Sequence, residues 1–89
     1  MKGDEERMKG KVIVRLKSEV SDPQGMTIQQ TVAKLGFGGV RKVRAGKFFE
    51  IEFDAPDADA ARQLLNNLCD RVLANPIIEN YSFEIEENP

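Results

Sequence analysis

Histidine is absent from this 89-residue chain, and cysteine occurs once, at Cys69. Without histidine, the Ser-His and Cys-His pairs that activate a nucleophile cannot form. The usual zinc, haem and iron–sulfur ligand sets need more histidine or cysteine than this chain has. A single cysteine also excludes an internal disulfide. The composition therefore excludes the most familiar catalytic and metal-binding constellations.

Long apolar runs are absent too. No run approaches the roughly 20 residues that span a bilayer, and the N-terminus is charged where a signal peptide is hydrophobic. We therefore expect a cytoplasmic protein that does not bind membranes. The 13 basic and 15 acidic side chains nearly cancel, so the broad positive field of a nucleic-acid binder is missing. One basic concentration remains, at Arg41, Lys42, Arg44 and Lys47. A phosphate or RNA could dock there, although ordinary charges at a hairpin explain it as well.

The spacing of apolar residues predicts six elements after a charged, flexible extension over residues 1–10. The single domain expected over 11–87 contains, in order, a strand over 11–18, a helix from Pro23 to Leu35, an irregular strand over 40–45, a strand over 48–54, a helix from Asp57 to about Ala74 and a strand over 78–86. Asp22 and Asp57 are typical helix caps, and Gly36 favours a left-handed helix end.

This order predicts an α+β fold of the βαββαβ, ferredoxin-like type. Such a fold is a two-layer sandwich in which two helices cover one face of a four-stranded antiparallel sheet. The expected core combines the inward strand faces with six helix residues, namely Ile28, Val32, Leu35, Leu64, Leu65 and Leu68.

The face without helices is a candidate surface for homo-oligomer formation. In the usual strand order, Arg15 and Lys17 would lie between Glu50 and Glu52 on one side and Glu84 and Glu86 on the other, with Ile13 and Phe48 adding apolar area. This mixture is typical of a buried protein interface. A solvated face with weak ion pairs is the alternative. A general acid/base pair among these glutamates is disfavoured, because outward acids are ordinary in strands.

Several strings in the sequence resemble the PurS family. They are a Val/Ile-rich strand ending Leu16-Lys17, then Asp22-Pro23-Gln24-Gly25 before a helix ending Leu35-Gly36-Phe37, then Val43-Arg44-Ala45-Gly46-Lys47, and finally Leu73-Ala74-Asn75-Pro76-Ile77-Ile78-Glu79 before the tyrosine strand. The resemblance covers Lys11 to Glu86, whereas the first ten residues depart from it.

The resemblance implies a noncatalytic accessory subunit of phosphoribosylformylglycinamidine synthase, in purine biosynthesis. Family members form homodimers or tetramers and join a glutaminase subunit, PurQ, to a large synthetase subunit, PurL, which uses ATP and Mg²⁺. The implied role is to help ammonia pass between two aligned sites. No catalytic, metal or cofactor residue is expected in this subunit. The partner-interface candidates are Asp22, Gln24, Gly25, Arg44, Lys47, Asn75 and Asn80.

Two other classes stay open from the residues alone. An RNA-binding module of this fold would need aromatic side chains on the open sheet face, where only Phe48 is expected. A small ligand-sensing domain would need no special side chains, because such sites can use backbone groups.

Overall fold

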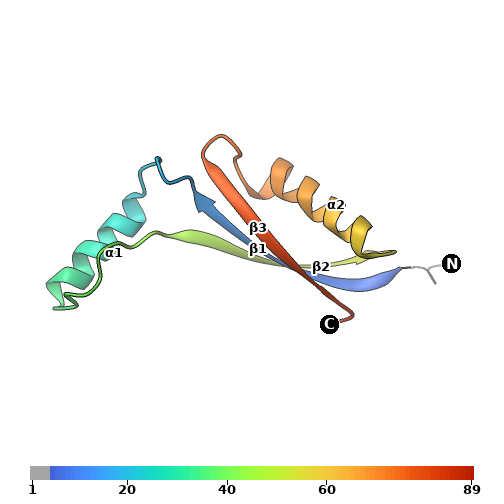
Figure 1. Ribbon diagram of the computed structural model, residues 1–89, viewed down its shortest axis with the longest axis horizontal. Coiled ribbons are helices and arrows are strands. Elements are labelled where there is room, and N and C mark those ends of the chain that lie inside the picture. The colour runs from blue at the N-terminus through green and yellow to red at the C-terminus, as the bar shows by residue number, and fades with distance from the viewer. Residues whose placement is uncertain (1–4) are drawn as a thin grey trace.

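The computed structural model describes residues 5–89. The chain forms a long, thin body of 59 × 27 × 14 Å (Figure 1). Its described residues form three strands, two α-helices and one π-helical turn. They are β1 (Glu6–Leu16), α1 (Pro23–Lys34), β2 (Gly46–Ala55), α2 (Ala58–Leu68), η1 (Cys69–Leu73) and β3 (Glu79–Glu87).

β1 is the central strand of an antiparallel sheet with the order β2-β1-β3. Its alternating residues point to opposite faces of the sheet. Met8, Val12 and Val14 face α2 and are buried, whereas Ile13 and Arg15 face away from α2 and are exposed. This period of two fixes the register, because a slip of one residue would expose every buried side chain.

The core lies between one face of the sheet and α2. Leu65 and Cys69 are fully buried against Val12 and Val14. Gly10 lets the helix approach β1, because a Cβ at that position would lie 2.6 Å from a Leu65 methyl carbon. α2 begins as predicted, with the Asp57 carboxylate accepting from the Ala60 N–H at 2.8 Å.

α1 does not pack on the sheet. It projects beyond the end of β1, well away from α2 (Figure 1). Asp22 caps the helix as predicted, and Gly36 adopts the left-handed conformation with a φ of 93°. Two of the three predicted core positions of α1 are wrong, since Ile28 is 40% exposed and Leu35 is 70% exposed. The third, Val32, is partly buried. On α2, the predicted core residue Leu64 is also exposed, at 39%.

The predicted fourth strand, over 40–45, does not form in the described chain, so the sheet has three strands there. Side chains at the α1 end of the molecule take up N–H groups that a strand would offer to a neighbour. The Val43 N–H donates to Gln29 Oε1 at 3.2 Å, and the Ala45 N–H donates to Asp22 Oδ2 at 2.7 Å. The segment is therefore tied to α1 instead of to a strand.

The predicted extension over 1–10 is also corrected, because β1 begins at Glu6 and not at Lys11. Met8 is fully buried in a second small cluster with Ala55 and Ala61. The start of this strand was missed because Met8 is one apolar residue among charged ones, and a single apolar residue does not produce the alternation that predicts a strand. Residues 1–4 of the predicted extension lie outside the described part of the chain.

Candidate functional site

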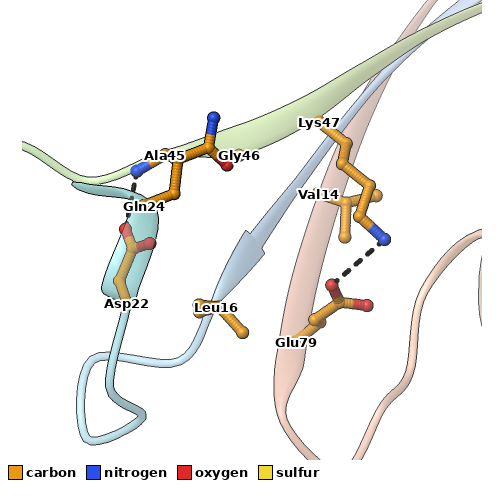
Figure 2. Close-up of a pocket in the computed structure, with 8 residues that line it drawn as sticks. All are labelled: Val14, Leu16, Asp22, Gln24, Ala45, Gly46, Lys47 and Glu79. Carbon is orange, nitrogen blue, oxygen red and sulfur yellow. Dashed lines mark hydrogen bonds and ion pairs between the residues drawn. The ribbon is translucent and has the colours of Figure 1, made fainter. Parts of the chain in front are cut away.

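A cleft of about 150 Å³ lies where α1 joins the sheet, on the sheet face that carries α2. We call it the helix-side cleft (Figure 2). β1, β2, β3 and the start of α1 all contribute to it. Its lining residues are Val14, Leu16, Asp22, Gln24, Ala45, Gly46, Lys47 and Glu79. Three of the predicted interface residues, Asp22, Gln24 and Lys47, therefore meet in one place.

Asp22 connects the start of α1 to the segment before β2, a contact that we call the junction. One carboxylate oxygen accepts from the Gly25 N–H at 3.0 Å, and the other accepts from the Ala45 N–H at 2.7 Å. These two backbone hydrogen bonds, aided by the charge of Arg44, hold the pKa of Asp22 below its ordinary value despite an opposing desolvation effect. The side chain is buried. Asp22 therefore stays ionised and ties α1 to the segment before β2.

Lys47 and Glu79 close the opposite wall of the cleft (Figure 2). Lys47 Nζ lies 3.5 Å from Glu79 Oε2, and Glu79 Oε1 accepts from the Asn75 N–H at 2.6 Å. The glutamate side chain is only 11% exposed. Both of its oxygens therefore have partners, so this carboxylate is suited to holding β2, β3 and the η1–β3 loop together.

The other predicted interface residues surround the same end of the sheet without sharing the cleft. Arg44 donates to the carbonyls of Val20 and Lys17, at 3.1 and 3.0 Å. Asn75 shapes the loop before β3 through its side-chain oxygen, which accepts from the Ile77 N–H. Asn80 lies with Arg44 in a separate pocket on the open face.

Gly25 is buried within the first turn of α1. A Cβ at this position would collide with the carbonyl oxygen of Val43 and with the Asp22 carboxylate. The glycine therefore has a packing role at the junction, in that it lets the 43–45 segment lie directly against the helix.

The open face of the sheet carries the predicted oligomer residues Ile13, Arg15, Phe48, Glu50 and Glu84. Ile13 lies opposite Phe48, and these side chains are 45% and 58% exposed. Together with Lys11, Ser82, Phe83 and Glu84 they line a pocket of about 270 Å³.

The predicted charge register on this face is wrong. Lys11 is the residue between Glu50 and Glu84, and Lys9 is the one between Glu52 and Glu86. Arg15 lies instead between Gly46 and Asn80. Lys17 follows the last residue of β1 and donates its N–H to the Ile78 carbonyl at 2.8 Å. The pairing shifts because β1 extends toward the N-terminus beyond its predicted start.

The residues of the helix-side cleft hold segments of the chain together, because the Asp22 and Glu79 carboxylates are bound by backbone N–H groups and by Lys47. Burial raises the pKa of the Cys69 thiol, which lies in the core. Within residues 5–89, no cluster of three or more acidic or cysteine side chains is arranged to hold a metal ion. The same residues contain no helix with the length and hydropathy of a membrane span.

Two contributors to the junction escaped the sequence analysis. Gln29 binds Val43 through its side-chain amide, and Glu79 joins the helix-side cleft to the η1–β3 loop. Nothing in the local pattern around Gln29 distinguishes it from its neighbour Gln30. Glu79 is part of a family-like string, which was the available signal.

The fold and its clefts define a class of small α+β protein. The exposed apolar side chains on α1 and the charged residues at its junction with the sheet are features of a subunit that docks on other chains. Comparison with known families places the chain within that class. The family model described as "PurS: Phosphoribosylformylglycinamidine (FGAM) synthase" matches residues 9–87. The chain belongs to the PurS family.

Individual relatives agree with this assignment. A phosphoribosylformylglycinamidine synthase subunit PurS from Synechocystis sp. is 45% identical over 75 residues, which cover 84% of this chain and 75% of that protein. A crystal form of Bacillus subtilis PurS aligns with a TM-score of 0.81 at 39% identity, over 90% of this chain and 99% of that one. A chain in the structure of PurLQS from Thermotoga maritima aligns with a TM-score of 0.79 at 31% identity, over 91% and 96%.

Proposed function

We propose that this chain is the small accessory subunit of a phosphoribosylformylglycinamidine synthase, joining the glutaminase subunit PurQ to the synthetase subunit PurL. In this role it helps ammonia pass between the two larger subunits, and it acts in the cytoplasm. The observation that carries the proposal is the match, over nearly the full length of both chains, to a chain in the structure of PurLQS from Thermotoga maritima.

The chemistry of the helix-side cleft supports a bridging role. Its acidic groups are already bound by backbone N–H groups and by Lys47. A subunit that aligns two active sites needs fixed surfaces more than reactive groups, because ammonia is lost to protonation and diffusion across an open gap. In this proposal PurL uses ATP and Mg²⁺, and the small subunit contributes no cofactor to the reaction.

We further propose that a second copy completes the two-layer, ferredoxin-like arrangement. The accessible surface is 6615 Å², against roughly 5,200 Å² expected for a folded monomer of this mass. Within the described part of the chain, α2 is the one helix that covers the sheet, and Phe49 and Ile51 on β2 remain only partly buried. Ile28 and Leu35 on α1 are exposed. Placing α1 of one copy over the sheet of another would bury both apolar surfaces in a homodimer, and dimers could pair as a tetramer.

Reconstitution tests the accessory role. PurL and PurQ from the same organism are assayed for glutamine-dependent product formation with and without this chain. We expect glutamine-dependent turnover to fall by about 100-fold or more without it, because the two sites are then no longer aligned. Turnover with added ammonium chloride should remain, because ammonia then reaches the synthetase from solution.

Two results would contradict the proposal. One is full glutamine-dependent activity without the small chain, and the other is equal loss of the glutamine-dependent and ammonia-dependent activities. Gel filtration of the mixture provides the physical control, since this chain should co-elute with both larger subunits.

A further inference from the structure

A second pocket, of about 390 Å³, lies at the same end of the sheet but on the open face. We call it the basic pocket. Its lining residues are Arg15, Leu16, Ser18, Lys42, Arg44, Ala45 and Asn80. Three of these seven residues are cations, the Asn80 side-chain amide provides a neutral donor, and no carboxylate is among them. This composition is typical of an anion site.

The backbone positions several of the donors. Arg15 and Asn80 are cross-strand partners on β1 and β3, so the sheet fixes their spacing. The Arg44 guanidinium is held by two carbonyl oxygens of the turn after β1, those of Val20 and Lys17. This arrangement lowers the entropy lost when Arg44 binds a ligand, because the side chain is already ordered.

Nearby carboxylates do little to neutralise the basic pocket. Glu79 pairs with Lys47 on the other face of the sheet. Both carboxylate oxygens of Asp22 accept hydrogen bonds from backbone N–H groups, although its negative charge still acts on Arg44. Glu19 accepts a long hydrogen bond of 3.4 Å from the Ser18 hydroxyl. It is exposed, so solvent screens its charge. A positive excess therefore remains in the pocket.

We infer that the basic pocket binds the phosphate group of a small phosphorylated metabolite. A phosphate carries about −1.5 to −2 charges near neutral pH and three acceptor oxygens, which matches two guanidinium groups and an ammonium. The volume suits a ligand of sugar-phosphate size, within the roughly 300–1,000 Å³ of typical ligand sites. The lining offers no aromatic ring for a base to stack on, so recognition centres on the phosphate. This site is independent of the accessory role, because it requires only the small chain.

Titration of the full-length chain tests the inference. The ¹⁵N-labelled protein is titrated with inorganic phosphate, ribose 5-phosphate and acetate at constant ionic strength, and the amide signals of Ser18, Arg44 and Asn80 are followed. Saturable shifts with both phosphates and much weaker ones with acetate are expected. Tighter binding of ribose 5-phosphate would assign the pocket to phosphate monoesters, and equal binding would assign it to the phosphate ion itself.

Charge-matched variants separate a formed site from diffuse attraction. The double variant Arg15→Gln/Lys42→Gln removes two pocket cations and should weaken phosphate binding by about tenfold or more, since charge-assisted hydrogen bonds are lost. The control Arg41→Gln/Lys34→Gln removes the same charge from exposed residues outside the pocket and should bind within about twofold of the parent. Linear shifts without saturation, acetate binding as tight as phosphate, or equal weakening in both variants would overturn the inference.

Discussion

Asp22 shows how one side chain can tie two segments of a thin protein together. Its oxygens bind the N–H groups of Gly25 and Ala45, which are 20 residues apart in the chain. Because both hydrogen bonds favour the charged form, the pKa of Asp22 is lower in the folded chain than in the unfolded one. The folded state therefore binds fewer protons than the unfolded state as the pH falls.

This difference predicts an acid-sensitive contribution to stability. The contribution of Asp22 is complete above its ordinary pKa of 3.8 and is lost as the pH falls through the lower folded value. Asp22→Asn keeps an acceptor oxygen but has no charge to lose. We expect the variant to melt several degrees below the parent near neutral pH, and the gap to narrow below about pH 4. Thermal denaturation followed by circular dichroism at a series of pH values measures this gap.

The same experiment at high salt identifies the cause. Backbone hydrogen bonds are the largest contributors and Arg44 the smallest, so the narrowing should persist when salt screens the charge pair. A gap that stays constant down to about pH 3, or one that disappears with salt at neutral pH, would contradict the assignment.

At the scale of elements, the junction between α1 and the 43–45 segment depends on Gly25. Gly25→Ala should destabilise the fold by about 1–3 kcal/mol, because the new methyl group meets a backbone carbonyl that cannot move alone. Gly38→Ala is the matched control, since a Cβ there has open space. It should leave stability unchanged or slightly higher. Urea unfolding of both variants tests the pair, and equal stability for the two would refute this packing role of Gly25.

Local patterns predicted the elements well because their causes are local. The alternation around Phe49, Ile51 and Phe53 produced a strand with that inward face, and both aspartate caps form the expected hydrogen bonds. Gly36 ends its helix in the left-handed conformation as expected. In each case, neighbours within about four residues determine the conformation.

Placement of the elements depends on distant contacts and was harder to predict. The spacing of Ile28 and Leu35 marks an apolar helix face but not the surface that covers it. Within residues 5–89, both side chains stay exposed. The local pattern of segment 40–45 predicts a strand. The acceptors that bind this segment instead, Asp22 and Gln29, are at least 14 residues away in the chain, so a local pattern does not reveal them. The candidate residues at the junction were found through resemblance, whereas Glu79 emerged only from its contacts.

At the scale of the whole molecule, the exposed apolar face of α1 makes the stability of the fold depend on association with another chain. A chain 14 Å thin along its shortest axis leaves Ile28 and Leu35 in water unless a second copy covers them. If the folded dimer is the stable species, its melting temperature depends on protein concentration, because dilution favours separate, unfolded chains. Each tenfold rise in concentration then adds about 1.4 kcal/mol to the stability of the dimer.

We therefore expect the melting temperature to rise by a few degrees over a hundredfold range of concentration. Ile28→Glu places a charge on the apolar face of α1, so it should lower the melting temperature and remove most of the concentration dependence. Gln30→Glu adds the same charge at an exposed position about 200° around the helix, and should keep the dependence of the parent. Light scattering during gel filtration should show a dimer or tetramer for the parent and the control. A parent that is monomeric and melts at one temperature throughout would show that α1 needs no second copy, leaving PurL or PurQ as its cover.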